Sequence, residues 1–466
     1  MRAAYRRVGD LHRLAGPAAS TTSSRLARAA AVPWQRSVAW LLFLGPLFFL
    51  SYGFANSLAA RGQVDAAVVF DWERRIPFVP WTILPYWSID LLYGLSFLLC
   101  RTPRAVDLHA LRLLTAQLVS VACFVLFPLR YSFVRPATDG LFGALFDALA
   151  GFDKPYNQAP SLHISLLVIL WARFAGAARG AGAVVVHVWA LLIAVSVLTT
   201  YQHHFVDVPT GAMAGLLCLW LWPETGPAPW VAARLTASPQ RRRLAACYLT
   251  AALAVAALGY AVGGAGLWLG WLALALLLVA LCYGLLGPAG FQKYDGRHSL
   301  GAALLLAPYT LLAWANARLW TRRHPQPDPV VDGVWLGRLP DARAMAHGNF
   351  RGLVDLTAEL PAPRGDWAYA GLPWLDLVTP EVRRLEHAAA QIEHLRRRGP
   401  LLVACALGYS RSAGAVAAWL IVSGRCASAD EAVALLRRAR PCVVVGPALR
   451  QALARLSPPP ETVGGA

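Results

Sequence analysis

Lysine and acidic residues are both scarce in this sequence. Lys154 and Lys293 are the only lysines, and 25 acidic residues oppose 43 basic ones, so arginine carries almost all of the net charge of +18. Charged residues make up 15% of the chain and hydrophobic residues 57%, which excludes an ordinary water-soluble protein. An arginine-rich surface can bind nucleic acid, but arginines beside apolar spans are what orientation in a membrane requires. We therefore expect a membrane protein without a nucleic-acid partner.

Disulfide and metal-binding patterns are also missing. Five of the eight cysteines lie in or beside apolar runs, where a small apolar packing role is the default. The other three, Cys405, Cys426 and Cys442, have no metal-ligand spacing among them. The sequence therefore predicts neither a metal nor another cofactor.

Apolar runs with close to the roughly 20 residues needed to cross a bilayer recur along much of the chain. We predict spans at 38–56, 82–100, 109–128, 162–178, 183–200 and 205–222, and three more at 245–262, 265–287 and 299–318. The first span lies behind a long arginine-rich tail, so it is not a cleaved signal peptide, and the N-terminus is expected to be cytoplasmic. The pattern predicts a multi-pass cell (inner) membrane protein.

Changes in composition divide the chain into four expected parts. A basic tail at 1–36 precedes a six-span membrane domain at 37–225. A proline-rich and arginine-rich stretch then leads into additional membrane segments at 226–323. The stretch His324-Pro-Gln-Pro-Asp-Pro329 ends the apolar region, and a soluble α/β domain is expected at 328–460.

The last part alternates short apolar strands with helical patterns. Strands are predicted at 334–336, 353–356 and 401–404. Thr379 is predicted to cap a helix with Pro380 at its first position and with arginines at 396–398 at its end. Ser428 and Glu431 form the pattern of a capping box that opens another helix.

The segment Cys405-Ala-Leu-Gly-Tyr-Ser-Arg411-Ser412 combines the groups that a phosphocysteine reaction needs. Cys405 ends an apolar strand, a five-residue loop follows, and Arg411 opens a helix that is expected to run to about residue 423. Backbone N–H groups and the positive helix end would face a bound dianion, and the Arg411 fork can hold two phosphate oxygens. Ser412 is placed to help the thiolate leave. The loop residues expected to contact the phosphate are Gly408, Tyr409 and Ser410.

On these residues, the stretch from 330 to 457 resembles the dual-specificity branch of the cysteine phosphatases. The resemblance implies a general acid on a loop some thirty residues upstream of the nucleophile, where Asp376 stands, with Asp366 as its rival. The family usually has a histidine just before the nucleophile, but here the residue is Ala404. The fold class is therefore expected to be a multi-span α-helical membrane bundle followed by a soluble α/β cysteine-phosphatase domain.

A second set of candidate residues lies at the ends of the predicted spans. Pro160-Ser-Leu-His163 opens the fourth span, and a loop with His203 and Asp207 connects the fifth to the sixth. Because successive spans cross the membrane in opposite directions from a cytoplasmic N-terminus, both segments are expected on the non-cytoplasmic side, together with Arg130 and Arg135. One histidine, oriented by a carboxylate, can attack phosphorus while the other protonates the departing oxygen and arginines hold the charge. His203 and Asp207 are spaced i, i+4, which puts them on one helix face if the sixth span begins there, and His204 points elsewhere.

Residues 80–222 resemble the type 2 phosphatidic acid phosphatase superfamily through Pro-Ser-x-His and His-x-x-x-Asp. The resemblance makes His203 the nucleophile, Asp207 its partner and His163 the acid. The sequence departs from the family pattern at two positions: Val197 stands where arginine is usual, and Pro128 stands where lysine is usual. Arg130 is expected to take the role of that lysine. These departures favour the inositol phosphotransferase branch, the sphingolipid-synthase type.

Three hypotheses for function stay open at this point. The first is a two-headed membrane enzyme with a lipid phosphate phosphatase fused to a cysteine phosphatase. The second makes the membrane part a head-group phosphotransferase, and the third makes the tail a phospho-ligand binding module without turnover. The expected partners are a lipid phosphate, a phosphoprotein and membrane lipids. The tail is expected to be cytoplasmic if 299–318 lies along the membrane surface.

Overall fold

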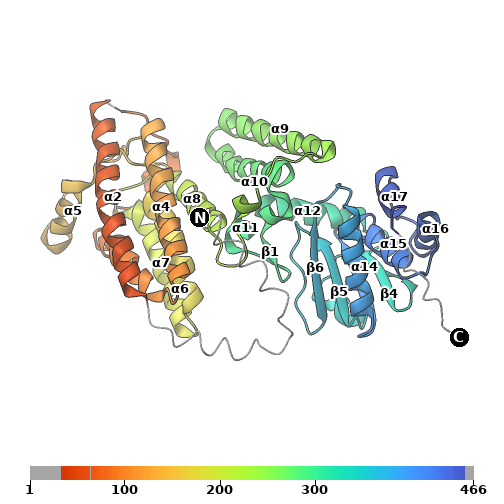
Figure 1. Cartoon of the computed structure of the whole chain (residues 1–466). Coiled ribbons are helices and arrows are strands. Elements are labelled where there is room, and N and C mark those ends of the chain that lie inside the picture. Colours follow the sequence, from red (N-terminus) through yellow and green to blue (C-terminus); the bar gives the residue numbers. More distant parts are fainter. Residues whose placement is uncertain (1–32, 63, 457–466) are drawn as a thin grey trace. The chain divides into compact units, whose positions relative to one another are not determined.

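The computed structural model describes residues 33–62 and 64–456, which fall into two compact units, Met1–Glu224 and Thr225–Ala466 (Figure 1). The unit boundary lies next to the one expected after residue 225. The additional membrane segments and the α/β domain, expected as separate parts, share the second unit. Most of the predicted basic tail, at 1–32, lies outside the described residues, and the first described helix begins at Trp34.

The first unit is built from helices. Each of its six predicted spans corresponds to a helix, and α5, which the sequence did not predict, is an additional short helix. The helices are α2 (Trp34–Arg61), α3 (Ile83–Ser96), α4 (Pro103–Leu126), α5 (Gly140–Phe152), α6 (Leu162–Ala177), α7 (Ala181–Thr199) and α8 (Asp207–Leu221). α6 packs closely on α8, and the Ser165 hydroxyl of α6 donates to the Gly211 carbonyl of α8 at 3.0 Å.

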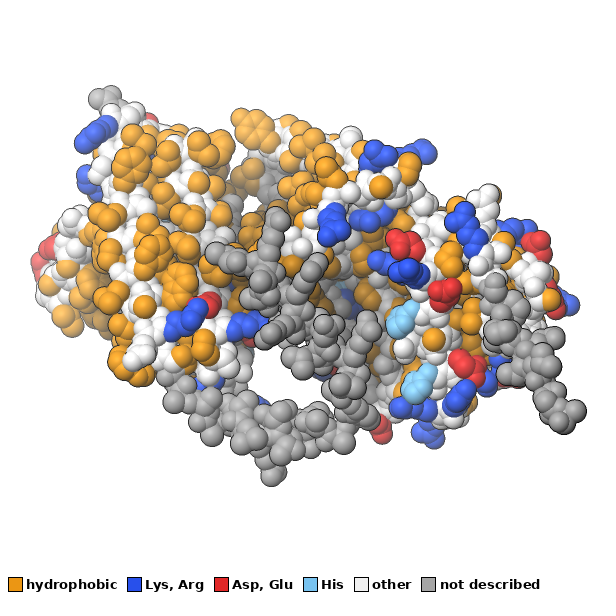
Figure 2. Space-filling view, in the orientation of Figure 1, with side chains coloured by type: hydrophobic (Ala, Val, Ile, Leu, Met, Phe, Trp, Pro, Cys, Tyr) orange, Lys and Arg blue, Asp and Glu red, His pale blue; other side chains and the backbone are white. Residues whose placement is uncertain are grey.

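Six helices between residues 34 and 291 are long and apolar enough to cross a membrane. They are Trp34–Arg61, Pro80–Leu99, Pro103–Leu126, Ala181–Thr199, Pro239–Val262 and Gly264–Phe291. Figure 2 shows hydrophobic side chains covering the visible face of the helices in the first unit. Large exposed apolar surfaces of this kind are rare in water-soluble monomers. These helices therefore fit a membrane protein.

The second unit begins with a pair of apolar helices, α9 (Pro239–Val262) and α10 (Leu269–Leu281). A π-helical turn at Cys282–Leu286 and a small hairpin, β1 (Lys293–Tyr294) and β2 (Arg297–His298), follow. The ninth predicted span, at 299–318, is not one continuous helix. It breaks at Leu306, whose φ of −88° and ψ of 1° are not helical, into α11 (Leu300–Leu305) and α12 (Ala307–Trp320), and Pro308 stands in the first turn of α12.

A five-stranded sheet forms the centre of the α/β domain. Its order is β3 (Asp328–Val331), β4 (Val334–Arg338), β7 (Leu401–Cys405), β5 (Gly352–Thr357) and β6 (Ala368–Trp374). β3 runs antiparallel to β4, and the other pairs are parallel. The three predicted strands are present, whereas β3 and β6 were not predicted. Because parallel strands end at one edge, the segments after β4, β5, β6 and β7 meet there.

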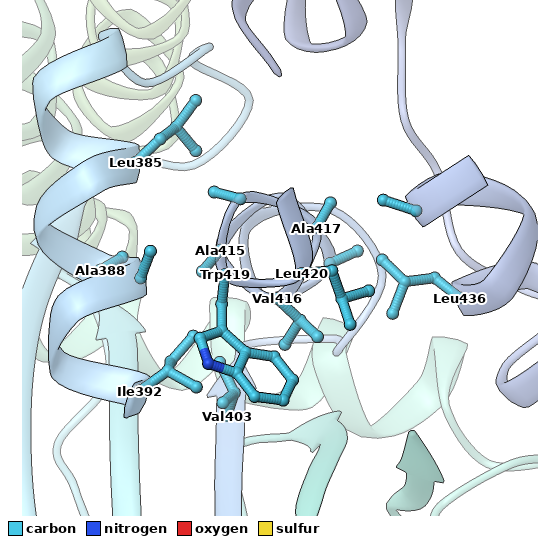
Figure 3. Close-up of a cluster of buried hydrophobic side chains, with 14 of the residues drawn as sticks. Leu385, Ala388, Ile392, Val403, Ala415, Val416, Ala417, Trp419, Leu420 and Leu436 are labelled. Carbon is cyan, nitrogen blue, oxygen red and sulfur yellow. The ribbon is translucent and has the colours of Figure 1, made fainter. Parts of the chain in front are cut away.

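Alternate residues of the strands supply two cores. On one face, Val403 of β7 packs with α14 (Val382–Arg396), α15 (Arg411–Val422) and α16 (Ala429–Ala439), around Trp419 (Figure 3). On the other face, Leu402 and Ala404 pack with Ala317 of α12 and Met345 of α13 (Ala342–His347). The domain closes with α17 (Pro447–Leu453). α12, predicted as part of a membrane span, therefore packs against the sheet of this domain.

Two local predictions have different outcomes. The Thr379 cap is wrong: α14 begins at Val382, and the backbone N–H of Thr379 bonds to the Gln240 side chain at 3.3 Å instead of starting a helix. The capping pattern at Ser428 is present, since its hydroxyl accepts from the Glu431 N–H at 3.2 Å. The Glu431 carboxylate bonds back to the N–H of Ala427 at 2.7 Å, one residue before the cap.

Candidate active site

The nucleophile loop lies at the edge where the parallel strands end. Cys405 is the last residue of β7, and Arg411 is the first residue of α15. The Cys405 carbonyl accepts a hydrogen bond from the Leu339 N–H at 2.7 Å, which fixes the start of the loop against the end of β4. The strand, loop and helix therefore place the thiol at the N-terminal end of α15, where an anion is favoured.

Two donors face the sulfur of Cys405. The Gly408 N–H points at Sγ at 3.2 Å, and the Ser412 hydroxyl lies 3.2 Å from the same atom. Cys405 and Ser412 are both buried. A sulfur that carries negative charge during a reaction would accept both hydrogen bonds, and bonds to a charged acceptor are stronger than bonds to a neutral one.

The shape of the loop depends on Gly408 and on a buried arginine behind it. Gly408 has a φ of 75°, and a side chain there would bring its Cβ within 2.3 Å of the Gly337 carbonyl carbon. The Gly408 carbonyl accepts from Nε of Arg440 at 3.1 Å. Arg440 is fully buried and also bonds to Asp328 at 2.6 Å, so it ties the loop to β3.

Tyr409 and Ser410, both predicted to contact the phosphate, have different surroundings. The Tyr409 hydroxyl donates to the carbonyl of Trp320, the last residue of α12, at 3.2 Å. Its side chain is therefore engaged with α12. Ser410 is exposed at the end of the loop, and its carbonyl accepts from the Gly414 N–H at 2.8 Å.

Arg411 is buried and almost completely paired. Its two terminal nitrogens form a fork with the Glu359 carboxylate at 2.6 and 2.9 Å, and Nη1 also donates to the Trp374 carbonyl at 3.0 Å. Among the residues that the structure describes, Nε of Arg411 has no partner. One donor of the guanidinium is thus left for a ligand beside the Cys405 loop.

The Arg411 and Glu359 side chains hold each other charged. Burial disfavours both charges, yet the pKa of Arg411 is raised well above its ordinary value by Glu359 and Asp376. Burial likewise acts to raise the pKa of Glu359, but Arg411 outweighs it and lowers that pKa. Both groups therefore remain ionised at neutral pH, and the Arg411 guanidinium has a fixed orientation.

The structure brings Asp376, and not Asp366, to the loop. Oδ1 of Asp376 lies 3.1 Å from Nη2 of Arg411, and the side chain is 37% exposed. Asp366 is exposed in the segment before β6. We call residues 375–381, between β6 and α14, the acid loop. Its position at the same sheet edge as Cys405 explains why Asp376 reaches the site.

The acid loop is held by helices of the same unit. The Tyr283 hydroxyl, in the π-helical turn, donates to the Asp376 carbonyl at 3.0 Å. The Gln240 side chain, in α9, donates to the Leu377 carbonyl at 2.6 Å and accepts from the Thr379 N–H. Leu377 has a φ of 56°, a conformation that a leucine rarely adopts and that these bonds help to hold.

Sequence reasoning missed Glu359 and a buried lysine. Glu359 is 52 residues from Arg411, and its only signal is a polar position just after the strand beside β7. Lys293, in β1, donates to Asp355 at 2.6 Å and to the Thr357 hydroxyl at 2.8 Å. Since a buried ammonium needs a partner, Asp355 and Lys293 together tie the hairpin to β5.

These features agree with the comparison of the chain with known proteins. Residues 334–457 match the family model described as dual specificity phosphatase, catalytic domain. This part of the chain is therefore a dual-specificity phosphatase domain, and such phosphatases are hydrolases. The match lies wholly within the second unit. A search of curated proteins finds no match to the chain.

Solved structures of phosphatases are similar to about a quarter of the chain. The structure of human DUSP28 is 25% identical, and the match covers 27% of this chain and 92% of that one, with a TM-score of 0.25. A mouse putative dual specificity phosphatase complexed with zinc tungstate is 27% identical, with 28% and 84% coverage and a TM-score of 0.25. Tk-PTP in the active form is 27% identical, with 28% and 97% coverage and a TM-score of 0.26.

The histidines of the first unit form a separate cluster. Nδ1 of His203 lies 3.2 Å from the Asp207 carboxylate, and Nε2 lies 3.0 Å from the Ser161 hydroxyl. The condition for a shared helix face is not met, because α8 begins only at Asp207 and His203 lies in the loop before it. The pair meets because the loop folds back, and the His204 N–H also donates to Asp207 at 3.0 Å.

His163 and His203 line one cavity of about 460 Å³. His163 lies in the first turn of α6 and stacks on Tyr86, with ring centroids 4.2 Å apart. Within residues 33–62 and 64–456, Nε2 of His163 has no hydrogen-bond partner. Most of the lining is apolar or aromatic, and Asp90 and Asp153 are its carboxylates. The cavity thus combines two histidines with an apolar chamber.

The two predicted arginines do not join this cluster. Arg130 pairs with Asp65 at 3.1 Å, and Arg135 reaches Asp147 at 3.4 Å, with both aspartates largely exposed. Neither arginine lines the cavity. Their roles as phosphate ligands are therefore not supported by this geometry, because each guanidinium turns to a surface carboxylate.

The second histidine of the loop, His204, points away from the cavity, as predicted. Its Nδ1 lies 3.0 Å from the buried Glu73, and its ring stacks on Tyr131. It therefore anchors the loop. The described residues contain no group of three or more His, Cys, Asp or Glu side chains that could hold a metal ion.

Proposed function

We propose that this chain is a membrane-bound phosphatase whose C-terminal domain hydrolyses phosphate monoesters through Cys405. The observation that carries the proposal is that Nε of Arg411 has no partner among the described residues, while the Gly408 N–H and the Ser412 hydroxyl both lie 3.2 Å from the sulfur of Cys405. A phosphate dianion at the loop would accept from that Nε and from the loop amides.

The residues divide the reaction between them. The Cys405 thiolate attacks phosphorus and forms the phosphocysteine, while Asp376 gives its proton to the departing oxygen of the substrate. Water then attacks the phosphocysteine, Asp376 takes its proton, and inorganic phosphate leaves. Ser412 donates to the sulfur as it becomes a thiolate again. Asp376 already contacts Arg411, so the acid loop lies in a position suited to the first step.

A phosphorylated lipid and a phosphoprotein are both proposed as substrates of this site. The loop residues Ala406 to Ser410 carry no basic side chain, so the loop itself gives no preference for highly anionic head groups. The binding-module alternative, without turnover, rests on Ala404. That residue is fully buried in an apolar cluster and offers no polar group to the loop.

A second function is proposed for the first unit because His163 and His203 line one largely apolar cavity. With Nδ1 of His203 turned to Asp207, Nε2 is the atom that would attack phosphorus, and His163 would protonate the leaving oxygen. An apolar chamber beside these groups suits the chains of a lipid phosphate. A head-group phosphotransferase is the alternative, and product analysis separates the two, since transfer needs an alcohol acceptor and releases no phosphate.

We also propose that the phosphatase domain is cytoplasmic. An even number of membrane spans returns the chain to the side of its N-terminus. The first eight predicted spans would do so, and α12 packs on the phosphatase domain through Ala317 instead of forming a ninth span. On the side away from Ala317, α12 exposes Leu311, Leu312 and Leu319, which suits contact with the membrane surface. Maleimide labelling of Cys442 in intact cells tests this topology; Cys426 is buried and unsuitable.

The two-site proposal is tested with the full chain and three variants: Cys405→Ser, His203→Ala and the double change. Phosphate release is measured from lipid phosphates, phosphopeptides and a generic aryl phosphate. Each single change is expected to abolish a different activity. If either change alone removes every activity, the two-site proposal is wrong, and if Cys405→Ser leaves aryl phosphate hydrolysis intact, the cysteine mechanism is wrong.

A further inference from the structure

A cavity of about 590 Å³ lies beside the acid loop and does not include the Cys405 loop. Four arginines line it: Arg234, Arg241, Arg384 and Arg455. Glu381 is the one carboxylate of its lining, and among the described residues none of the four arginines has an ion-pair partner. Four positive charges against one negative charge give this cavity an excess of positive charge, which favours an anion.

The cavity lies at one end of a predicted membrane span. Its lining includes residues 234–238, just before α9, and Arg241 in the first turn of that helix. α9 is long and apolar enough to cross a membrane, and two more arginines, Arg242 and Arg243, directly follow Arg241 near the start of this helix. Arginines at the end of a span lie at the level of the lipid head groups. The anions available at that depth are the phosphates of phospholipids.

A short chain of contacts joins this cavity to the catalytic loop. Nε of Arg241 donates to the Tyr283 carbonyl at 3.0 Å, and the Tyr283 hydroxyl donates to the Asp376 carbonyl at 3.0 Å. Asp376 in turn contacts Arg411. Val378 and Thr379 of the acid loop line the cavity directly. A ligand in the cavity would therefore touch the loop that carries the general acid.

We propose that this cavity binds the phosphate of an anionic phospholipid head group, and that the bound head group holds the acid loop in the position where Asp376 contacts Arg411. The inference rests on the proposed function, because it assumes that α9 is embedded in a bilayer and that Asp376 is the acid. It adds a second phosphate site, separate from the Cys405 loop, which makes the phosphatase most active at an anionic membrane surface. Arginine forks suit such a phosphate group.

The test uses the full chain in vesicles of phosphatidylcholine alone or with added phosphatidylglycerol, and follows hydrolysis of an aryl phosphate. We expect phosphatidylglycerol to raise kcat by about threefold or more, because its anionic head group is attracted to arginines at the membrane surface and would occupy the cavity. The double variant Arg384→Gln and Arg455→Gln is expected to lose this increase. Its matched control, Arg383→Gln with Arg437→Gln, removes two exposed charges outside the lining and is expected to keep the increase.

A control with a water-soluble phosphate ester distinguishes binding of a lipid head group from binding of a free ester. Glycerophosphoglycerol, a soluble phosphodiester, is added to phosphatidylcholine vesicles, and an equal rise in kcat would assign the cavity to a soluble ligand and overturn the lipid proposal. An unchanged kcat in phosphatidylglycerol, or an equal response of the double variant and its control, would also overturn it.

A direct binding measurement tests the lipid site independently of whether the proposed phosphatase activity is found. The Cys405→Ser chain in neutral detergent is titrated calorimetrically with short-chain phosphatidylglycerol, with and without the Arg384 and Arg455 changes. Binding that is weakened only by those changes supports the cavity even if no hydrolysis is found in any lipid. Absence of binding refutes the cavity even if Cys405-dependent hydrolysis is present.

Discussion

The hydroxyl of Tyr283 donates a hydrogen bond to the backbone carbonyl of Asp376 across 3.0 Å. Tyr283 belongs to the π-helical turn that follows α10, and Asp376 belongs to the acid loop of the phosphatase domain. Single π-helical turns are frequent at functional sites. A helix that fits a membrane span thus contacts, through one residue, the backbone of the proposed general acid.

Removing that bond should slow catalysis without weakening binding. Tyr283→Phe leaves the ring in place and deletes a hydrogen bond worth about 1 kcal/mol, so kcat on an aryl phosphate is expected to fall about fivefold with KM nearly unchanged. The control is Tyr260→Phe, on the exposed surface of α9. A change confined to KM would mean that Tyr283 does not position the acid loop.

Gly408 and Gly424 offer a matched pair for testing the loop. Both have positive φ, 75° and 74°, but a Cβ at 408 would meet Gly337 at 2.3 Å, whereas a Cβ at 424 meets nothing within 4 Å. Gly408→Ala is expected to lower kcat/KM by about a hundredfold or more, because the loop must shift away from β4. Gly424→Ala should cost about 1 kcal/mol of stability and leave kcat/KM unchanged. Equal effects of the two changes would refute the close contact.

The buried pair of Glu359 and Arg411 should make stability depend on pH. The pKa of Glu359 in the folded chain lies below its ordinary value of 4.5, so the pair contributes fully above that pH. The contribution is lost as the pH falls through the ordinary value towards the folded pKa. Glu359→Gln should therefore destabilise the protein by about 3 kcal/mol at pH 7 and by less at pH 4.

Thermal unfolding in neutral detergent at both pH values checks this prediction. The control is Glu386→Gln, an exposed carboxylate of α14 outside the ion pairs that the structure describes. The same loss of stability for Glu359→Gln at both pH values would contradict the assignment of the pH dependence to this pair.

Restoring the usual family histidine at position 404 should not speed the enzyme. Ala404 is fully buried on the face that packs with Met345, Phe350 and Leu402, so a larger polar ring has no room. Ala404→His is expected to destabilise the domain by about 1–3 kcal/mol through overpacking. Ala434→His, on the exposed side of α16, is the control for thermal unfolding. A faster and equally stable Ala404→His would show that this core accommodates the ring.

The chemistry around Cys405 could be predicted because it is local in sequence. A strand, a five-residue loop and a helix carry the thiol, the amides and the guanidinium within eight residues. The contact from Glu359 to Arg411 joins positions 52 residues apart, and it depends on β5 lying next to β7 in the sheet. No short pattern in the sequence encodes that strand order.

Tertiary contacts override two local rules of helix formation. Thr379 and Pro380 have the composition of a helix start, yet the Gln240 side chain holds the Thr379 N–H and keeps the pair in the acid loop. The spacing of His203 and Asp207 fits a helix face, yet a loop brings them together. In both cases the deviation lies at a candidate site.

The two lysines differ in their chemical accessibility. Lys293 is enclosed by Asp355 and Thr357, whereas Lys154 is exposed beside Asp153, which lines the histidine cavity. An amine-reactive dye applied to the folded protein should therefore modify Lys154 and spare Lys293. The lysine-poor sequence thus provides, without mutation, a single side-chain attachment point for a spectroscopic reporter next to that cavity.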